Sequence, residues 1–495
     1  MQASELLNEN NLKLLAQLPK EQELFFKWFL AVTQVHRPSH HLEKAFETVK
    51  AWGTKLGFTY QEDAGHNVIF TVPATPGKEN VPSLVIQGHL DIVAVGTFNP
   101  DGSVPVKIEN GRLTSGVSTL GADDGIAVAA CFALMECEKS FPHGPLEFLI
   151  TADEEVGLLG ASQLAGPPFM KSRSMINLDS EEWGIFYTSC AGGMNIFYEK
   201  LLQRQEFQGK HLTLTVNNFV SGHTGLLIHE NRQNAVKWLV RILIAARNNG
   251  HQFRLCSIEG GKMHNAIPSL ATAEVVVSGD AAAFTTFANE YHAKLVKENR
   301  VVETKVPKIA VNEAGSAVAL TEEDSNKVLN LLETIPHGVY CMSPEIQGMV
   351  NTSQSVSVTK MEGDNISIQV FARTNEGNHM DFLINHNKAI AALAGFNVRI
   401  PESEVIGPWP PALGSKIMDV AQSTFKSMFN ADPVVTGIHA GLECGAIQNR
   451  GYDDLEAISF GPLVHGAHTT EENVTIDTAA KCYDLTIEIV KAWAK

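Results

Sequence analysis

The chain has 495 residues, of which 44% are hydrophobic and 19% are charged, a composition typical of globular proteins with sizeable cores. Because domains usually hold roughly 100–200 residues, this length predicts about three domains or two large ones. The 55 Asp and Glu residues outnumber the 38 Lys and Arg residues, so the net charge is −17. A chain of this charge is repelled by phosphate backbones, and we expect no nucleic acid as a partner.

Neither a membrane span nor a secretory signal is expected. The longest unbroken apolar run, 126–135, has ten residues, which is about half of what a membrane-spanning helix needs. The N-terminal residues show no basic segment followed by an apolar one. The seven cysteines are odd in number and form no Cys-x-x-Cys pair, which indicates reduced thiols. We therefore expect a cytoplasmic protein with no membrane partner.

Hydrophobic patterns at the two ends of the chain predict an α/β domain. Short apolar runs bounded by Gly and Pro are typical of buried parallel strands, and helical patterns alternate with them. The expected strands are 67–72, 83–87, 146–151, 174–178 and 457–460. The expected helices are 24–35, 41–56, 412–429 and 478–494.

The middle of the chain has a different pattern. Residues 211–216, 274–277 and 366–373 alternate like half-exposed antiparallel strands, with helical patterns at 234–248 and 281–298. This change predicts an α+β domain, residues 201–402, inserted into a discontinuous α/β domain. The α/β domain would comprise residues 1–200 and 403–495, with a mostly parallel sheet flanked by helices.

Common single catalytic motifs are absent. The chain has no Gly-x-Ser-x-Gly elbow and no phosphate-binding glycine loop, and His229-Glu230 lacks the second His of a zincin helix. Histidine and acidic residues instead follow the expected strands. His89 and Asp91 lie at the end of strand 83–87, where residues two apart project to the same side. A carboxylate bonded to one imidazole nitrogen leaves the other free for a metal, although a surface His-Asp pair is the simpler alternative.

Four expected strands and one helix start carry such residues. They are His89 and Asp91, Asp123 and Asp124, Asp153 to Glu155, Asp179, and His465 and His468. Each group alone has an ordinary explanation, such as helix capping or a solvated loop. However, ligands in open α/β sheets bind at the carboxyl ends of the strands. Two His with three or more carboxylates suit zinc, cobalt or manganese, so we predict a two-metal hydrolytic site.

These motifs resemble those of the cocatalytic-zinc aminoacylase, carboxypeptidase and dipeptidase family, which includes carnosinases. The resemblance rests on Gly88-His89-Leu90-Asp91, Gly121-Ala122-Asp123-Asp124-Gly125, residues 151–157, residues 177–179 and Ala467-His468-Thr469, in the family's order. Residues 221–225, 262–268 and 439–445 are most similar to the aminoacyl-histidine dipeptidases of the bacterial cytosol. His264 departs from the pattern, in which Arg or another residue is expected.

The resemblance implies two divalent metal ions, with zinc favoured and cobalt or manganese as alternatives. Asp123 would bridge the ions, with His89 and Asp179 completing one site and Glu155 and His468 completing the other. Glu154 would be the general acid–base, and Asp91 would assist by orienting His89. We prefer His468 to His465 because Ala-His-Thr-x-x-Glu is the family's terminal pattern.

The resemblance also implies a substrate with a free carboxyl terminus. Arg373 would grip the carboxylate bidentately, His223 would stabilise the oxyanion, and Asn265 would make a second polar contact. His439 and Glu443 are further candidates for substrate binding. The inserted domain would act as a lid that closes over the sheet edge. His223 would come from the same chain or from a partner copy, which leaves monomer and homodimer open.

The expected function is hydrolysis of unblocked dipeptides, including Xaa-His substrates such as carnosine. A water between the two metals would attack the peptide bond, with Glu154 as general base. One alternative is an N-acyl amino acid deacylase or a carboxypeptidase of the same family, because the same metals and base would cut either amide. A remote alternative from another class is a metal-stabilised peptide-binding protein without turnover.

Overall fold

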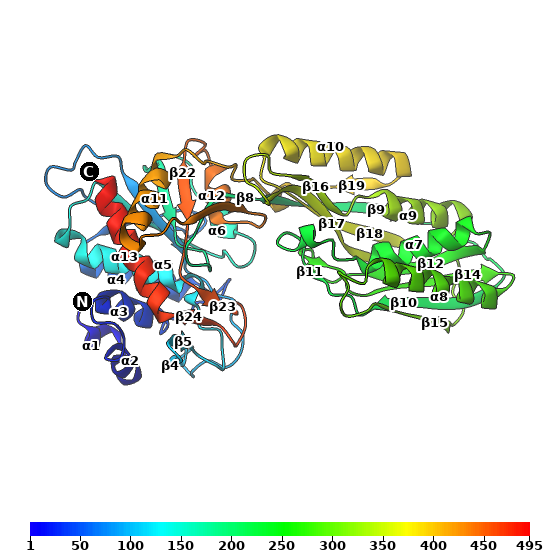
Figure 1. Ribbon diagram of the computed structural model, residues 1–495, viewed down its shortest axis with the longest axis horizontal. Helices are drawn as coiled ribbons and strands as arrows, with labels where there is room; N and C mark the ends of the chain where they lie inside the picture. The colour runs from blue at the N-terminus through cyan, green and yellow to red at the C-terminus, as the bar shows by residue number, and fades with distance from the viewer. The chain divides into compact units, whose positions relative to one another are not determined.

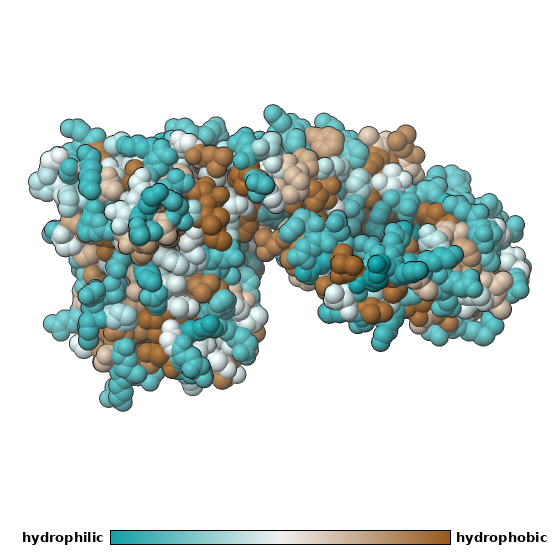
Figure 2. Space-filling model, viewed as in Figure 1, coloured by the Kyte–Doolittle hydropathy of each residue, from teal (hydrophilic) through white to brown (hydrophobic).

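The computed structural model describes residues 1–495, which divide into two compact units (Figure 1). Unit 1 comprises Met1–Cys190, Trp409–Gly437 and Leu442–Lys495. Unit 2 comprises Ala191–Pro408 and the short segment Ile438–Gly441. None of the helices combines the length and the apolar character that crossing a bilayer requires. Hydrophilic residues cover most of the face of each unit seen in Figure 2.

Unit 1 is built on an eight-stranded sheet. Its order is β1 (Thr59–Glu62), β2 (Val68–Val72), β6 (Leu146–Thr151), β3 (Leu84–His89), β7 (Ser174–Asn177), β22 (Glu456–Ser459), β8 (Ile185–Cys190) and β21 (Val434–Ile438). The four central strands, β6, β3, β7 and β22, are parallel, and β6, β3 and β7 are buried along their whole length. Their apolar sequences follow from this burial, because helices cover both faces of a parallel sheet. The predicted α/β fold class is confirmed.

Beside this parallel centre, β2 and β8 run in the opposite sense to the central strands. β1 pairs with β2, β2 with β6, and β8 with β22, each time antiparallel. Only residues 63–67 join β1 to β2, and a connection this short permits only an antiparallel pair. The sheet is therefore parallel where its strands carry the expected polar motifs and mixed towards its edges.

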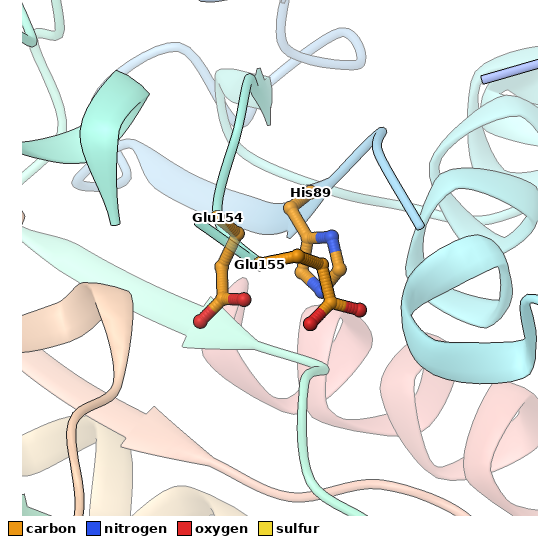
Figure 3. Close-up of side chains that lie close together, drawn as sticks. All are labelled: His89, Glu154 and Glu155. Atoms are coloured by element: carbon orange, nitrogen blue, oxygen red, sulfur yellow. The ribbon is translucent and has the colours of Figure 1, made fainter. Parts of the chain in front are cut away.

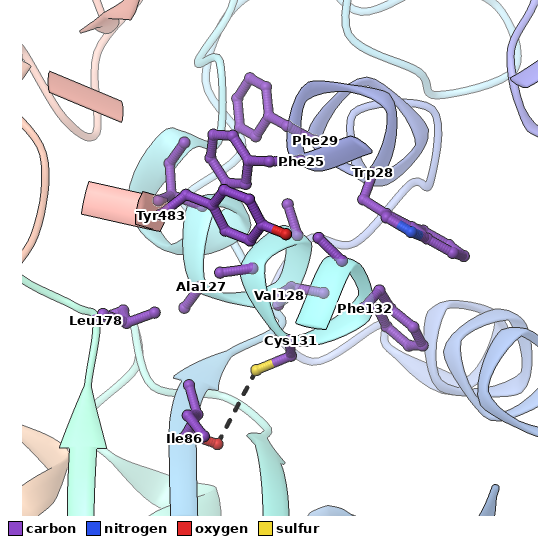
Figure 4. Packing of buried hydrophobic residues seen from close by; sticks show 14 of the residues in the cluster. Phe25, Trp28, Phe29, Ile86, Ala127, Val128, Cys131, Phe132, Leu178 and Tyr483 are labelled. Atoms are coloured by element: carbon purple, nitrogen blue, oxygen red, sulfur yellow. Dashed lines mark hydrogen bonds between the residues drawn. The ribbon is translucent and has the colours of Figure 1, made fainter. Parts of the chain in front are cut away.

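Helix α5 (Ala122–Cys137) is the centre of the core of unit 1. Figure 4 shows Phe25 and Trp28 of α3 (Glu23–Val32) and Tyr483 of α13 (Ile476–Trp493) packed around it. The ring centroids of Trp28 and Phe132 are 5.0 Å apart, and the Cys131 thiol donates to the carbonyl of Ile86 in β3. The long apolar run is thus a buried helix, which is why its residues are hydrophobic on all sides.

The remaining helices of unit 1 are shorter or lie nearer the surface. They are α1 (Ala3–Leu6), α2 (Glu9–Leu15), α4 (Glu43–Leu56), α6 (Leu159–Ser162), α11 (Lys416–Phe429) and α12 (Glu443–Gln448). A four-stranded sheet joins two distant parts of the chain. Its order is β23 (Val464–His465), β24 (Asn473–Thr475), β5 (Arg112–Thr114) and β4 (Lys107–Glu109). This small sheet fixes the loop between β23 and β24 beside the segment that leads to α5.

Unit 2 contains a ten-stranded sheet whose pairings are antiparallel. Eight strands follow the order β15 (Lys308–Glu313), β10 (Lys210–Asn217), β14 (Ala271–Ser278), β12 (Gln252–Gly260), β17 (Val350–Glu362), β18 (Asn365–Thr374), β9 (Gly192–Leu201) and β19 (Asn397–Arg399). β16 (Gly338–Met342) pairs with β17, and β20 (Val405–Ile406) with β9. The helices are α7 (Ala235–Asn248), α8 (Ala281–Glu298), α9 (Glu322–Thr334) and α10 (Gly377–Ala394). A separate pair, β11 (Gly222–His223) and β13 (Ala266–Ile267), carries one of the expected motifs.

Candidate metal centre

The carboxyl ends of the central strands of unit 1 carry the expected polar residues. Because these strands are parallel, their ends meet at one edge of the sheet, and the start of α5 joins them there. The residues at this edge are His89 at the end of β3, Glu154 and Glu155 after β6, Asp179 after β7, His468 beyond β22 and Asp123 at the start of α5.

Asp123 lies between two histidines. Its Oδ1 is 2.9 Å from Nε2 of His89, and its Oδ2 is 3.0 Å from Nε2 of His468. Nε2 of His89 is also 3.6 Å from Oδ1 of Asp179, and Nε2 of His468 is 2.8 Å from Oε2 of Glu155. The side chains thus form two groups that share Asp123, and within each group the potential ligand atoms lie within 4.8 Å of one another.

The donor atoms suit a divalent metal, although their spacing is partly that of hydrogen-bonded pairs. Nitrogen and oxygen ligands of a tetrahedral zinc ion at about 2.0–2.2 Å are roughly 3.3–3.6 Å apart, so the pairs at 2.8, 2.9 and 3.0 Å would separate by a few tenths of an ångström to hold an ion. The buried Oε1 of Glu155 has no hydrogen-bond partner. Burial raises the pKa of Asp179 to about 7, and the charges of Asp123 and Glu155 add to this shift. A bound cation would remove that penalty, so the donor set suits a metal such as zinc.

Asp91 supports two parts of this edge at once. Its side chain is fully buried, and its Oδ1 lies 3.5 Å from Nδ1 of His89. The same carboxylate accepts hydrogen bonds from the backbone N–H groups of Glu154, at 2.9 Å, and Glu155, at 3.2 Å. Burial opposes ionisation, but the hydrogen bond and charge of His89 lower the pKa of Asp91 to about 2. The contact between His89 and Asp91 that their spacing predicts is present. The hydrogen bond from the backbone of Glu154 to Asp91 was not predicted.

Glu154 and Glu155 are neighbours whose carboxylates diverge (Figure 3). The carboxylate of Glu155 lies beside the His89 ring, whereas that of Glu154 points to the other side. Glu154 remains close enough to form a group with His89 and Glu155. Burial holds the pKa of Glu154 well above its ordinary value, and the charges of Asp179 and Glu155 act in the same direction. A carboxylate with a raised pKa is a stronger base than an exposed one.

Glu443 lies at the start of α12, buried in unit 1. Its Oε2 accepts hydrogen bonds from Nε2 of Gln87, at 2.5 Å, and from the hydroxyl of Thr151, at 2.6 Å. Its Oε1 has no partner, and burial raises the pKa of Glu443 to about 7. His465 is an exposed residue of β23 and belongs to neither ligand group, whereas His468 belongs to the group with Asp123 and Glu155.

The expected substrate residues of unit 2 form a second cluster around Gly225. A Cβ atom on Gly225 would lie 2.1 Å from the carbonyl oxygen of His439 and 3.1 Å from both Nε of Arg373 and Cε1 of His223. Only glycine allows these three residues to converge. Asn265 lies beside this cluster, because its backbone carbonyl accepts a hydrogen bond from the N–H of Thr224, the residue before Gly225.

Arg373 is a buried cation without an anionic partner. It is 7% exposed, its guanidinium stacks on Phe371 at 4.4 Å, and its Nε has no hydrogen-bond partner. Burial lowers the pKa of Arg373 to about 10. Because an unpaired buried charge is costly, this arrangement is suited to binding an anion.

The imidazole of His223 has a defined proton position. The backbone N–H groups of Gly225 and Leu226 both donate to its Nδ1, at 3.2 and 3.0 Å, so the proton of the neutral ring lies on Nε2. Burial and the charge of Arg373 lower the pKa of His223 to about 4, which keeps the ring neutral. Nη2 of Arg373 is 3.3 Å from Nε2 of His223. Both nitrogen atoms carry protons, so a single acceptor that contacts both would satisfy them.

His439 and His264 complete the cluster. Nε2 of His439 lies 2.7 Å from Oγ of Ser353 and Nδ1 lies 3.0 Å from Oδ1 of Asn375, and burial lowers the pKa of His439 to about 3. His264 packs edge-on against Phe371 with ring centroids 4.9 Å apart. The placement of His439 in unit 2 was not foreseen from the sequence, since only the segment Ile438–Gly441 returns to that unit.

Sequence reasoning missed two buried charged residues beside the ligands, Arg37 and Glu472. Glu472 is part of the Ala-His-Thr-x-x-Glu pattern, but nothing in the pattern indicates what its carboxylate contacts. Arg37 belongs to no motif. Both contact backbone groups of segments far away in the sequence, and only the folded chain shows this.

Known proteins resemble the chain over nearly its whole length. A cytosol non-specific dipeptidase of Escherichia coli is 32% identical over 473 residues, which are 94% of this chain and 96% of that protein. The crystal structure of an aminoacylhistidine dipeptidase from Vibrio alginolyticus matches with a TM-score of 0.85 and 29% identity, covering 97% of this chain and 98% of that one. Human carnosine dipeptidase 1 shares the fold, with a TM-score of 0.52 and 11% identity over 98% of this chain and 99% of that one.

The match to a family model agrees with these relatives. Residues 85–492 match the model of peptidase family M20/M25/M40, and this range includes His89, Asp123, Glu155, Asp179 and His468. The chain therefore belongs to peptidase family M20/M25/M40.

Proposed function

We propose that the protein is a metal-dependent dipeptidase of the cytoplasm that hydrolyses unblocked dipeptides, including Xaa-His dipeptides such as carnosine. The observation that carries this proposal is the pair of ligand groups sharing Asp123, with Glu154 beside them. The dipeptidase activity named for the relatives from Escherichia coli and Vibrio alginolyticus supports the choice of substrate. The name of the first relative and the seven free cysteines support the cytoplasm as its compartment.

Unit 1 is the proposed catalytic domain, and its two ligand groups would hold two divalent ions. His89 and Asp179 would hold one ion, Glu155 and His468 would hold the other, and Asp123 would be shared by both. Zinc suits these nitrogen and oxygen ligands, and cobalt and manganese are the alternatives. When bound, the ions polarise the scissile carbonyl and acidify water.

Glu154 serves as general base and then as general acid. Its carboxylate is directed away from the ligand Glu155, so it is free to take a proton from water and to deliver it to the nitrogen of the leaving amine. Its raised pKa, caused by burial, makes it a stronger base than an exposed carboxylate. Asp91 contacts Nδ1 of His89 and accepts a hydrogen bond from the backbone of Glu154. It therefore fixes the metal ligand and the base relative to each other.

Unit 2 is the proposed lid domain, which recognises the carboxyl terminus of the dipeptide. Arg373 donates two hydrogen bonds to that carboxylate, and Asn265 makes a second polar contact. His223 donates from Nε2 to the oxyanion that forms at the scissile carbonyl. His439 and Glu443 would assist in substrate binding. The carbonyl of His439 lies at the cluster around Gly225, and Oε1 of Glu443 has no hydrogen-bond partner.

The decisive experiment compares free and blocked dipeptides. Metal-replete protein is expected to hydrolyse Ala-His and Gly-Gly, to lose this activity with a chelator and to regain it with zinc, cobalt or manganese. N-acetylated amino acids serve as the matched substrates. Hydrolysis of the acetylated set alone would make the protein a deacylase, and metal binding without any turnover would make it a binding protein.

A further inference from the structure

Glu472 is a buried carboxylate four residues beyond His468. Its side chain binds the backbone at the start of α5, where Gly121 provides no side-chain cap. Oε2 of Glu472 accepts hydrogen bonds from the N–H groups of Leu120, at 2.8 Å, and Gly121, at 3.0 Å. Oε1 accepts from those of Ala122, at 2.7 Å, and Asp123, at 3.4 Å. One carboxylate thus holds the segment that presents Asp123.

The backbone of Glu472 is itself fixed. Its carbonyl accepts a hydrogen bond from the hydroxyl of Thr114, at 2.8 Å, and its N–H donates to the carbonyl of Thr469. The following strand, β24, pairs with β5, which contains Thr114. His468 lies in the same loop, between β23 and β24. Glu472 therefore connects the loop that carries His468 to the segment that carries Asp123.

Arg37 holds the same segment from its carbonyl side. The side chain is 1% exposed, and its Nη2 donates to the carbonyl of Gly121 at 2.6 Å. Its Nη1 donates at 2.6 Å to the carbonyl of Leu90, the residue that follows His89. A Cβ atom on Gly121 would lie 2.5 Å from Nη2 of Arg37, and one on Gly125 would lie 2.7 Å away. Two glycines therefore make room for the guanidinium.

The two buried charges act on one peptide segment. Glu472 binds the N–H of Gly121, while Arg37 binds its carbonyl. Burial lowers the pKa of Arg37, and the negative charge of Glu472 is the first of the nearby charges that oppose this shift. The charge of Glu472 thus offsets part of the burial of Arg37, and both side chains bind the backbone before Asp123.

We propose that Glu472 and Arg37 are positioning residues that together set the spacing of Asp123 from His89 and His468, and thereby the metal affinity of the centre. This inference rests on the proposed function, because it takes those three residues as metal ligands. Neither residue contacts the reacting atoms. Residues that orient ligands in this way typically change metal affinity or activity roughly 10–100-fold when they are replaced.

The test is Glu472→Gln, which keeps the size of the side chain but replaces one acceptor oxygen with an NH₂ group. We expect the metal affinity of the apoprotein, measured by competition with a chelator, to fall roughly 10–100-fold. We also expect kcat to fall while KM for Ala-His stays constant, because no substrate contact is lost. Glu471→Gln is the matched control, since it removes the same charge from the exposed neighbouring side chain and should change none of these values.

Two further measurements separate positioning from general stability. The visible absorption of the cobalt-loaded protein should shift in Glu472→Gln, because the ligand geometry changes, and should return towards the wild-type spectrum in Glu472→Asp, which keeps the charge. In the wild-type apoprotein, the amides of Leu120, Gly121 and Ala122 should exchange slowly with deuterium. This last measurement needs no variant and remains available if Glu472→Gln does not fold.

Three outcomes would overturn the inference. They are a folded Glu472→Gln with wild-type metal affinity, an unchanged cobalt spectrum in that variant, and rapid exchange of the three amides in the wild type. Failure of the proposed function gives a different result, namely wild-type turnover that does not respond to a chelator.

Discussion

The two units bury different kinds of ionisable side chain, mainly acidic in unit 1 and basic in unit 2. In unit 1, acidic side chains outnumber histidines at the sheet edge, and burial raises the pKa values of Asp179, Glu154 and Glu443. In unit 2, Arg373 is a buried charge without a carboxylate partner, and burial lowers the pKa values of Arg373 and of the neutral His439. Buried charges need a compensating partner, so unit 1 is suited to cations and unit 2 to anions. A dipeptidase that uses metal ions and recognises a free carboxylate needs both.

The largest expected effect comes from removing the ligand that both groups share. Asp123→Ala should lose most of the bound metal, and with it nearly all turnover, because each ion loses a ligand. Elemental analysis of the purified variant measures the metal content. Unchanged metal content would instead make Asp123 a helix-capping residue, and the acidic cluster of unit 1 would no longer be a cation-binding site.

Glu154→Gln tests whether one acid of the cluster acts on protons rather than on metal. The variant should retain its metal and its substrate binding, while kcat falls by roughly 10²–10⁴, the range typical of a lost general acid–base. Steady-state kinetics on metal-replete protein measures this fall. Wild-type kcat in that preparation would assign the base to another residue.

Arg373→Ala tests whether the basic cluster of unit 2 binds an anion. A charge-assisted bidentate contact contributes about 1.5–3 kcal/mol. Since about 1.4 kcal/mol is a factor of ten, kcat/KM for a dipeptide should fall roughly 10–150-fold. A dipeptide amide is the matched control, because it lacks the carboxylate and should be hardly affected. Equal losses on both substrates would show that Arg373 does not bind a carboxylate.

The smallest expected effect is a difference in the pH dependence of stability. The folded-state pKa of His439, about 3, lies below its unfolded value of about 6.5, so the unfolded chain binds more protons between these values. Unit 2 should therefore lose stability as the pH falls from about 6.5 towards 3. The folded-state pKa of Glu443, about 7, lies above its unfolded value of about 4.3, so unit 1 should lose stability as the pH rises between these values.

Hydrogen exchange of peptides from each unit, measured on metal-free protein at pH 5 and pH 7, checks this difference. His439→Gln should flatten the dependence in unit 2 only, and Glu443→Gln should flatten it in unit 1 only. Each group contributes at most about 1.4 kcal/mol per pH unit. Parallel trends in the two units would contradict the pKa shifts assigned to His439 and Glu443.

Regular hydrophobic patterns made much of the fold predictable. The apolar run 146–151 is β6 (Leu146–Thr151), and the pattern at 281–298 is α8 (Ala281–Glu298). β1 (Thr59–Glu62) was not predicted, because its residues are exposed at the edge of the sheet and carry no hydrophobic signal. Burial produces the pattern, so strands without burial leave little trace in the sequence.

The candidate site was predictable where side chains follow buried strands. His89 ends such a strand and Asp179 and Glu155 follow such strands within a few residues, and the geometry of a parallel sheet brings the ends of its strands together. Arg37 and Glu472 could not be predicted in the same way, because they bind backbone groups of Gly121 rather than other side chains. A backbone partner leaves no complementary residue in the sequence.

Anomalous scattering from a crystal of the zinc-loaded protein tests the central claim most directly. Two peaks should flank Asp123, roughly 3.5–4 Å apart as in other two-metal sites, one beside His89 and Asp179 and the other beside Glu155 and His468. The absence of peaks next to Asp123, or zinc bound only elsewhere in the molecule, would contradict the account.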